Sequence, residues 1–593
     1  MSIIDISQLN DEQIDAIQDD RNIFLVAAPG SGKTRALTYK IAKELSELDE
    51  QKKWIVAITY TNRAAEEIKE RIELLGIDTK KLWIGTIHGF CIEWILKPYG
   101  VFHQNLKNGY SIINSYDSEE IISLLCKSIS NPTISYYDCN HYFTSTRLEY
   151  SSCTLATRNN VVAVLNLYHQ KLISENQVDF ELILLYAYQL IDSQPLISVT
   201  LSRLFKHVLI DEFQDTREIQ YSIFSRILKA GRGGVKGFIV GDPNQAIYGS
   251  LGGYAISLQE LEQLSGQCFV EKQLNKNYRS SLRIINHFSN YKVYPSAINA
   301  AGDFSAFQST VTFNCSVHKD YLAPQLAGLI RASIEDENIN ENEICIVAPW
   351  WIHLASMTRK LIALLPEYDF NGPGMTPFAR DEDNFWYKVT KIALTEPSPS
   401  IYIRRLRWAS EIIKLLEAES YPISSITPKK LLKVFNSIDC SEEDGLNYLD
   451  KYFQKLEVSL EIDLTVYPSL SDHRTAFFES ASKRVDRIIS ENEGYAGSIT
   501  DFKKVFGEKK GITVSTIHGV KGAEFDVVIA YGLLEGIVPH FNETDANSAY
   551  KLLYVIGSRA RKHLHLISEQ GRGSQRYPKY PTTILEQHVF PYD

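Results

Sequence analysis

Short apolar runs alternate with segments of helical spacing over the first hundred residues. The runs IFLVAA (Ile23 to Ala28) and WIVAITYT (Trp54 to Thr61) are rich in apolar and β-branched residues, which predicts buried strands. A helical segment follows each run, and in the first segment Leu37, Ile41 and Leu45 share one face. A third run, KLWIGTIH, closes the block. This rhythm predicts a parallel sheet with helices packed on it.

The pattern changes between about 101 and 200, where Tyr, Ser and Asn become common and strand-like runs disappear. We expect a helical insertion there. Strand-like runs resume at HVLIDEF and GFIVGD, and a second α/β block begins near NYRSSLRIINHF. A mostly helical span from about 380 to 508 interrupts this block before GITVSTIHG and FDVVIAYG. The predicted fold class is therefore α/β, with two domains that have parallel sheets flanked by helices, each interrupted by a mainly helical insertion.

These changes in the hydrophobic pattern along the sequence predict the domain boundaries. The first domain would comprise 1–100 and 201–277, with its insertion at 101–200. The second would comprise 278–380 and 509–593, with a short accessory insertion at 381–508. The chain stops near the end of the second domain, so we expect no additional C-terminal nuclease domain.

Composition limits the classes of function. The 593 residues are too many for one core, and the length favours about four domains. Hydrophobic residues make up 44% and charged residues 23%, which excludes a disordered or fibrous protein. The net charge of −10 excludes a protein that coats nucleic acid through bulk positive charge. It does not exclude an enzyme with a local basic channel.

Cysteine content and hydropathy indicate the cellular compartment of the protein. The 8 cysteines are scattered and form no CxxC pair, which argues against a zinc ribbon or an iron–sulfur site and favours reduced thiols. The polar N-terminal stretch lacks the pattern of a signal peptide. No run of about 18 apolar residues predicts a membrane span. We therefore expect a cytoplasmic protein with no membrane partner.

The sequence AAPGSGKT, from Ala27 to Thr34, fits the P-loop pattern except that Ala27 stands where a Gly is usual. Backbone N–H groups of such a turn face phosphates at the positive end of the following helix. Lys33 would reach the β- and γ-phosphates, and the Thr34 hydroxyl would bind Mg²⁺. The alternative is an ordinary Gly-rich turn, which the strand before and the helix after disfavour. The predicted nucleotide contacts here are Ala28, Gly30, Ser31, Gly32, Lys33 and Thr34.

The sequence VLIDEFQDT supplies acidic partners after an apolar strand. Asp211 would hold the Mg²⁺ shell, and Glu212 would orient and deprotonate the attacking water. A solvated acidic turn is the alternative. A position at a strand end, downstream of a P-loop, favours the catalytic interpretation.

At this point the chain resembles a known family, the UvrD/Rep/PcrA-like superfamily 1 DNA helicases. The match runs in order along nearly the whole chain. LNDEQ resembles the family's Q motif, ITYTNRAAEEIKERI motif Ia and GTIHGFC motif Ib. DEFQDT resembles motif II and GDPNQAIYG motif III. QLNKNYRSSLRII resembles motif IV, VSTIHGVKGAEFDVVI motif V and LLYVIGSRARKHLHL motif VI.

The resemblance implies RecA-like domains with ATP and Mg²⁺ bound between them. The amide of Gln13 would read adenine, and Tyr278 would stack on it. Glu524 would contact the ribose, and Arg35 would lie against the nucleotide.

The resemblance also completes the catalytic set. Gln245 would sense the γ-phosphate and couple it to DNA. Arg279 and Arg559 would neutralise the charge that develops during phosphoryl transfer. The implied catalytic residues are Glu212, Asp211, Lys33, Gln245, Arg279 and Arg559.

The implied partner is single-stranded DNA or a 3′-tailed duplex. Tyr60, Thr61 and Asn62 of motif Ia would contact bases and backbone, as would His88 of motif Ib and His518 of motif V. Aromatic faces stack on bases without sequence preference.

The sequence departs from the family in motif III. Relatives carry an aromatic residue that stacks on a DNA base, with an arginine beside it, where this chain has Ser250 and Leu251. Tyr254 is a candidate substitute for the missing ring. The change puts efficient translocation in question, although not ATP hydrolysis.

Two further departures are smaller. Ser558 replaces the threonine of motif VI. Trp350 and Trp351 fall where relatives often carry a Tyr-Arg pair, and either DNA stacking or core packing would explain them.

Two functional hypotheses follow. The first is an ATP-dependent DNA helicase or translocase that moves 3′ to 5′. The second is a DNA-sensing ATPase subunit of an anti-phage defence complex, of the Gabija type, that regulates a separate nuclease subunit. An RNA-directed motor is a third possibility, but no residue pattern indicates recognition of a 2′-OH group.

Overall fold

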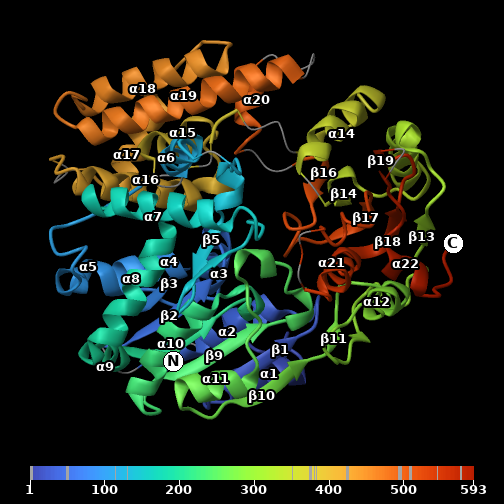
Figure 1. Cartoon of the computed structure of the whole chain (residues 1–593), viewed down its shortest axis with the longest axis horizontal. Coiled ribbons are helices and arrows are strands. Elements are labelled where there is room, and N and C mark those ends of the chain that lie inside the picture. The colour runs from blue at the N-terminus through green and yellow to red at the C-terminus, as the bar shows by residue number, and fades with distance from the viewer. Residues whose placement is uncertain are drawn as a thin grey trace. The chain divides into compact units, whose positions relative to one another are not determined.

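The computed structural model of the chain divides into two compact units, which are described separately (Figure 1). The first unit joins Met1–Val317 to Ile517–Asp593, and the second is His318–Thr516. Every predicted nucleotide or DNA contact lies in the first unit. The structure describes residues 5–48, 52–113, 115–129, 131–349, 351–372, 377–379, 381, 384–422, 426–491, 497–506, 510–541, 543, 545–574 and 577–593.

Six parallel strands form the central sheet of the first unit, in the order β10-β1-β9-β8-β2-β3. Successive side chains of a strand point to opposite faces. In β1, Ile23 and Leu25 therefore pack in one core cluster, whereas Phe24 packs in another. The strands are β1 (Ile23–Ala27), β2 (Trp54–Thr59), β3 (Leu82–Thr86), β8 (Phe205–Ile210), β9 (Lys236–Gly241) and β10 (Val270–Leu274).

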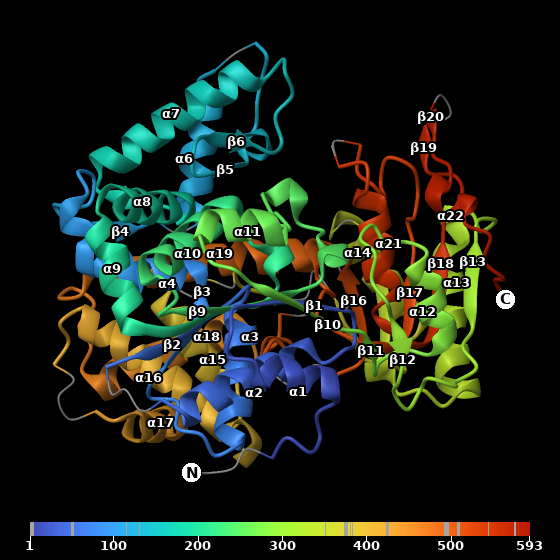
Figure 2. The same cartoon turned by 90° about the horizontal axis from the view of Figure 1, so that it is seen from below.

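Helices cover both faces of this sheet. Figure 2 shows α1, α2 and α3 on one side of the strands, with α10 and α11 on the other. The apolar residues of these helices pack in the same two core clusters as the strand residues, one cluster on each face of the sheet. The bounds are α1 (Asp11–Gln18), α2 (Lys33–Ser46), α3 (Asn62–Leu74), α10 (Glu218–Gly231) and α11 (Leu258–Ser265).

The parallel arrangement places the carboxyl ends of the strands along one edge, where open α/β sheets bind ligands. The P-loop follows β1, and Tyr60 follows β2. Asp211 follows β8, and Asp242 follows β9. Sequence motifs that are far apart in the chain therefore meet at one edge.

The insertion between β3 and β8 is mainly helical, as the sequence predicts, but it also contains strands that the pattern does not predict. Two-residue β4 (Ser111–Ile112) and β7 (Gln177–Val178) pair in parallel, and β5 (His141–Phe143) and β6 (Leu148–Tyr150) form an antiparallel hairpin. The hydrophobic pattern gives no sign of these strands, because strands of two or three residues are too short to show an alternating pattern. The helices include α4 (Ile87–Phe90), α5 (Lys97–Tyr99), α6 (Ser115–Lys127), α7 (Arg158–Ser174), α8 (Phe180–Ser193) and α9 (Pro195–Leu204), with a π-helix at Cys91–Leu96.

The rest of the first unit holds three parallel strands in the order β13-β18-β17. They are β13 (Val311–Asn314), β18 (Ala560–Ile567) and β17 (Phe525–Ala530). Two short strand pairs, β11 with β12 and β19 with β20, complete it. The remaining bounds are β11 (Lys276–Asn277), β12 (Asn299–Ala300), β19 (Gly573–Ser574), β20 (Tyr577–Pro578), α12 (Leu282–Ser289), α21 (Ser548–Gly557) and α22 (Thr583–Gln587).

The second unit combines three parallel strands, in the order β14-β16-β15, with a helical part. The helical part has its own core, which Phe378, Trp386 and Phe453 help to fill. The elements are α13 (Leu322–Arg331), β14 (Ile344–Ala348), α14 (Trp351–Leu364), β15 (Phe370–Asn371), α15 (Phe385–Ala393), α16 (Tyr402–Ala418), α17 (Pro428–Ser437), α18 (Gly445–Leu460), α19 (Pro468–Glu491), α20 (Ile499–Lys503) and β16 (Ile512–Thr516).

The predicted fold class is confirmed, because parallel sheets flanked by helices make up the α/β parts. Within the described residues no single helix is long and apolar enough to span a membrane. Only α8 and α9 together, which meet at a bend of 99°, have that length and composition.

Candidate active site

The P-loop connects the end of β1 to the start of α2. Gly30 and Gly32 have φ angles of 67° and 79°, in the left-handed region that favours glycine. Gly32 is the N-cap of α2, and no side chain caps this helix end. The first turn of α2 therefore presents backbone N–H groups and the positive end of the helix dipole, which together suit an anion.

Neighbouring side chains hold this loop closely. The amide of Gln13 donates to the carbonyl of Ser31 at 2.9 Å, and the amide of Asn277 donates to the carbonyl of Pro29 at 2.7 Å. A Cβ atom on Gly32 would lie 2.5 Å from Nε2 of Gln13. A side chain at this position would therefore displace the Gln13 amide, and the positive φ of Gly32 independently favours glycine.

Lys33 and Glu212 form an ion pair at the centre of the site, with Nζ and Oε2 2.6 Å apart. Burial alone would lower the pKa of Lys33, but the carboxylates of Glu212 and Asp211 raise it above its ordinary value. Burial alone would raise the pKa of Glu212, but the cations of Lys33 and Lys521 lower it. Glu212 is therefore ionised, and Gln214 donates to its Oε2 at 2.5 Å.

Asp211 has the opposite electrostatics. Burial and the adjacent charge of Glu212 raise the pKa of this carboxyl group. Its backbone N–H donates to the carbonyl of Ile58 at 2.9 Å, so the end of β8 is held against β2. Glu212 itself has a φ of 54°, an uncommon value for a residue with a side chain.

Gln245 and Arg559 meet in a second buried group. Nη2 of Arg559 donates to Oε1 of Gln245 at 2.9 Å, and Nε2 of Gln245 donates to Oδ2 of Asp242 at 2.9 Å. The other guanidinium hydrogen bonds in the described structure go to the neutral acceptors of Val555, Ala523 and Ser558. Burial and the nearby cation of Arg279 lower the pKa of Arg559 to about 9. Arg559 is thus a buried cation near neutral pH whose hydrogen bonds leave its charge without a direct carboxylate partner.

Sequence reasoning missed Lys521 and Asp215, although both lie in quoted motifs. Nζ of Lys521 lies 2.7 Å from the carboxylate of Asp215 and donates to the carbonyl of Gln245 at 2.5 Å. Nothing in the local sequence pairs residues that are so far apart in the chain. The sequence signal for them is that each is an ionisable residue inside a motif whose other residues were given roles in the site.

The remaining predicted nucleotide contacts surround the loop. Nε of Arg279 lies 2.7 Å from Oε2 of Glu524, so these two predicted residues pair with each other. The Tyr278 hydroxyl accepts from Asn10 at 2.8 Å, and Tyr278 is 41% exposed. Arg35 donates to the side chain of Gln8 at 2.7 Å. Thr34 is part-buried in the first turn of α2, beside Lys33.

Two of the predicted DNA contacts are joined through Tyr248, which the sequence analysis did not single out. The rings of Tyr60 and Tyr248 stack with centroids 5.1 Å apart, and the Tyr248 hydroxyl donates to the carbonyl of His518 at 3.2 Å. Nζ of Lys521 lies 5.1 Å from the centroid of Tyr248. Three successive contacts therefore link the ring of Tyr60 to Gln245, through Tyr248 and Lys521.

The other predicted DNA contacts are less tightly connected. Thr61 caps α3 by accepting from the N–H of Ala64 at 3.1 Å, and Asn62 begins that helix. His88 packs edge-on against Phe180, with centroids 5.2 Å apart. Burial lowers the pKa of His88 to about 4, so this imidazole is neutral.

The motif III departure lies in a short helix at Gly249–Leu251. Leu251 is 49% exposed, and Ser250 lies beside it. The Tyr254 ring packs edge-on against Tyr221, with centroids 6.4 Å apart. Trp350 and the side chain of Trp351 lie outside the described residues.

Comparison with known proteins decides the family. The UvrD/REP helicase N-terminal domain matches residues 9–264, and the UvrD-like helicase C-terminal domain matches residues 492–571. A probable DNA helicase II homolog of Mycoplasma capricolum is 30% identical, over 95% of this chain and 84% of that protein. The chain belongs to the UvrD/REP helicase family. The resemblance drawn from the motifs is thereby confirmed, and the chain is an enzyme of a helicase family.

Other members of the UvrD/REP family match over similar lengths. ATP-dependent DNA helicase srs2 of Schizosaccharomyces pombe is 26% identical over 94% of this chain and 71% of its own length. ATP-dependent DNA helicase PcrA of Bacillus subtilis is 24% identical over 96% of this chain and 83% of its own length. The similarity therefore extends over both units and their insertions.

Proposed function

We propose that this UvrD/REP family chain is an ATP-dependent DNA helicase that hydrolyses Mg-ATP at the P-loop and moves 3′ to 5′ along single-stranded DNA. The names of the relatives support ATP use and a DNA substrate. The direction of movement is what membership of this family implies. The observation that carries the proposal is the Gln245–Arg559 hydrogen bond beside the Lys33–Glu212 ion pair, because it joins residues from four motifs in one buried site.

The charges support phosphoryl transfer at this site. The backbone N–H groups of the P-loop would donate hydrogen bonds to the phosphates of ATP. Lys33 would then leave its ion pair with Glu212 and bind the β- and γ-phosphates. Glu212 would then be available to orient and deprotonate the attacking water. Arg559, a buried cation with neutral hydrogen-bond acceptors, would stabilise the charge on the transferred group.

The residues present also fit Mg²⁺. Thr34 and Asp211 offer the hydroxyl and carboxylate oxygens that this ion prefers. The raised pKa of Asp211 means that burial and Glu212 leave its carboxylate short of nearby positive charge, which a divalent cation would supply. Thr34 and Asp211 would hold the ion, which would supply positive charge against the negative charge of the phosphates.

The proposed coupling to DNA runs through Tyr248. Gln245, three residues earlier, contacts Arg559, and Tyr248 contacts both Tyr60 and His518. A change in the hydrogen bonds of Gln245 on nucleotide binding would shift the 3-10 turn Pro243–Gln245, and with it Tyr248, which is the N-cap of the next 3-10 turn three residues later. Movement of Tyr60 and His518 would then change the affinity for single-stranded DNA.

Steady-state ATPase of the full chain, with and without single-stranded DNA, tests this proposal. We expect strong DNA stimulation, which the Glu212→Gln variant abolishes. Strand displacement on duplexes with 3′ or 5′ tails then tests direction, and unwinding of the 5′-tailed substrate alone would contradict it. A chain with full turnover after Glu212→Gln would contradict the assignment of the site.

The exposed Leu251 favours a second candidate function. Motif III presents an aliphatic side chain where family members stack a DNA base, so the chain could sense DNA without moving efficiently. It would then act as the ATPase subunit of an anti-phage defence complex that controls a separate nuclease. Affinity purification from the native host distinguishes the two, because this candidate requires a nuclease at stoichiometric amounts. Processive unwinding by the isolated chain would count against it.

A further inference from the structure

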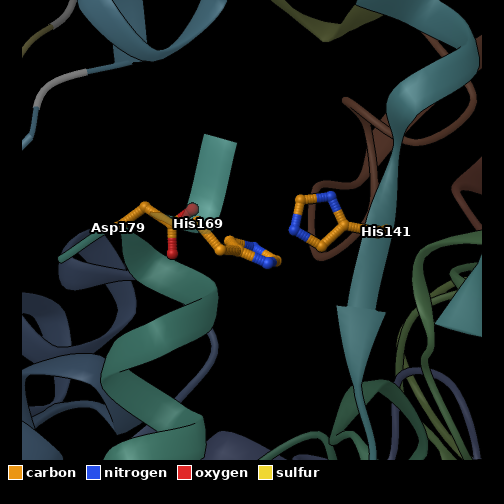
Figure 3. Close-up of side chains that lie close together, drawn as sticks. All are labelled: His141, His169 and Asp179. Carbon is orange, nitrogen blue, oxygen red and sulfur yellow. The ribbon is translucent and has the colours of Figure 1, made fainter. Parts of the chain in front are cut away.

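Two histidines and an aspartate converge in the first insertion, away from the nucleotide site. His141 begins the hairpin strand β5, His169 lies on α7, and Asp179 precedes α8. One nitrogen of each imidazole and one carboxylate oxygen all lie within 4.8 Å of one another. In Figure 3 the ring of His169 lies between the carboxylate of Asp179 and the ring of His141. None of these residues has a part in the proposed ATPase or DNA contacts.

The two imidazoles present unused nitrogen atoms. Nε2 of His141 and Nε2 of His169 are both buried and have no hydrogen-bond partner among the described residues. A buried polar atom without a partner typically costs about 1–3 kcal/mol. Nδ1 of His141 contacts the carbonyl of Cys139 at 2.9 Å, a contact that requires the proton on Nδ1 and leaves the Nε2 lone pair available.

Asp179 is held in place by two donors. The backbone N–H of Leu182 donates to Oδ1 at 2.8 Å, and the Tyr168 hydroxyl donates to Oδ2 at 3.0 Å. An ionised carboxylate accepts more than two hydrogen bonds, so both oxygens retain lone pairs. This pattern matches the outer hydrogen bonds that orient ligands around protein metal ions.

We propose that His141, His169 and Asp179 bind one Zn²⁺ ion. Two imidazole nitrogens and a carboxylate oxygen are a ligand set that zinc accepts, with a water molecule as fourth ligand. A cavity of about 170 Å³, lined by His141 and Asp179 among others, has room for that water. Zinc binds such nitrogen and oxygen sites more tightly than Fe²⁺ does, which favours zinc over iron.

Zinc–ligand bonds of about 2.0–2.2 Å in tetrahedral geometry place ligand atoms roughly 3.3–3.6 Å apart. The ligand atoms of this cluster lie within 4.8 Å of one another, so their side chains would move closer together on binding the ion. The ion would satisfy both unpartnered nitrogens at once. It would also tie together β5, α7 and the start of α8, which are in contact through the rings of His141 and His169 and the hydrogen bonds of Asp179.

The hairpin that the ion would hold contacts the motor part of the chain. The Tyr142 ring fills the space beside Gly252, where an added Cβ would lie 2.9 Å from the ring. At the hairpin turn, the backbone N–H of Ser145 donates to Glu218 of α10 at 2.6 Å. Gly252 directly follows Leu251 of motif III. The proposed ion is therefore structural, and it orders the hairpin against the motif III loop.

Metal analysis and zinc titration of the full chain test the proposal. We expect about one equivalent of zinc after purification. After removal with a chelator, competition with a chromophoric zinc indicator should give a single tight site. Zinc should also raise the midpoint of thermal unfolding, since it binds the folded state preferentially. Iron in place of zinc, or no binding tighter than micromolar, would overturn the assignment.

Variants locate the site. His169→Gln should weaken zinc binding more than about 100-fold, beyond the roughly 10–100-fold that loss of an outer hydrogen bond costs. His103→Gln is the matched control, because His103 lies in the same insertion and contacts Gln189 instead. Circular dichroism without zinc should be the same for both variants, which separates loss of the site from loss of folding. Unchanged affinity in His169→Gln would overturn the proposal.

Tyr168 is a positioning residue in this scheme. Tyr168→Phe removes the hydroxyl that donates to Asp179 and preserves the ring, so zinc affinity should fall about tenfold. The zinc-free unfolding midpoint should change less than the zinc-bound one. An equal change in both midpoints would mean that Tyr168 supports only the fold.

Discussion

The ammonium group of Lys521 lies 2.7 Å from the carboxylate of Asp215, and both side chains are almost completely buried. Burial raises the pKa of Asp215 and lowers that of Lys521, so each charge depends on the other. Lys521 also donates to the carbonyl of Gln245. The pair therefore connects motif II to motif V and to the turn that carries Gln245.

Removing one partner of this ion pair should be strongly destabilising. Lys521→Met leaves the Asp215 carboxylate buried and unpaired, which typically costs about 3–5 kcal/mol. Scanning calorimetry of the first unit's transition measures this, with Lys551→Met as control because its partner Asp545 is 38% exposed. The double variant Lys521→Met with Asp215→Leu should recover much of the loss. Equal stability of the Lys521 and Lys551 variants would contradict the interpretation.

Arg559 should act mainly on the chemical step. Arg559→Lys keeps a positive charge but loses the planar guanidinium that contacts Gln245 and Ala523, so kcat for ATP should fall about 10³-fold. Nucleotide affinity, measured with a fluorescent ATP analogue, should change far less. Arg283→Lys is the control, since Arg283 pairs with Asp593 instead. A loss of affinity equal to the loss of kcat would argue for a binding role.

Tyr60 should contribute to DNA binding without sequence preference. Its ring is 46% exposed and stacks on Tyr248, so Tyr60→Ala should weaken single-stranded DNA binding by about 1–3 kcal/mol. Fluorescence anisotropy with poly-dT and mixed-sequence oligonucleotides measures this. Tyr321→Ala removes a ring that is 70% exposed in the second unit and should have no effect. A sequence-dependent loss would indicate specific hydrogen bonds in place of stacking.

Restoring the family residues in motif III should increase DNA-stimulated activity. Ser250→Trp with Leu251→Arg returns a stacking ring and a cation to a short helix whose Leu251 is already half exposed, so both side chains have room. DNA-stimulated ATPase and unwinding are the measurements, and the basal ATPase should remain constant. No gain would mean that another contact already performs this task.

Glu44 should make the stability of the first unit pH-dependent. Its carboxylate lies 2.8 Å from Lys40 and 2.8 Å from His207. Burial alone would raise the pKa of Glu44, but His207 and Lys40 lower it. Burial lowers the pKa of His207, so near neutral pH this ring is a neutral donor and Lys40 is the charged partner.

A lowered pKa in the folded state means that the stabilisation is complete above the unfolded value of about 4.3 and is lost as the pH falls below it. Glu44→Gln should therefore destabilise the unit by about 3–5 kcal/mol at pH 7 and by progressively less toward pH 3. Thermal unfolding across this range measures the difference. Glu47→Gln, at a residue whose side chain is 52% exposed, should cost less than about 1 kcal/mol. If the destabilisation by Glu44→Gln instead grew as the pH fell, the pKa of Glu44 would not be lowered in the folded state.

Local sequence predicts local structure in this chain because the signals are short-range. The apolar run from Ile23 ends at glycines that need positive φ angles, and the run before Asp211 ends at the same sheet edge. Each family motif is likewise a short local pattern, and the order of these patterns along the chain identified the family. The roles assigned to individual site residues remain predictions that the experiments above address.

Pairings across the chain could not be predicted, because they depend on how distant segments meet. No local feature indicates that Lys521 pairs with Asp215, or that Tyr248 lies between Tyr60 and His518. The hairpin of His141 is too short for a recognisable pattern, so its approach to His169 appears only in three dimensions.

The division of the first unit between Met1–Val317 and Ile517–Asp593 affects how the chain is made. Asp215 and Lys521 are separated by 306 positions, so translation at about 5–20 residues per second leaves roughly 15–60 s between them. During that interval the P-loop sheet can form, but its buried carboxylate has no partner and the cation of Arg559 does not yet exist. The nascent chain therefore cannot complete the nucleotide site until the segment that carries Lys521 and Arg559 leaves the ribosome, and ATP turnover must wait for that segment.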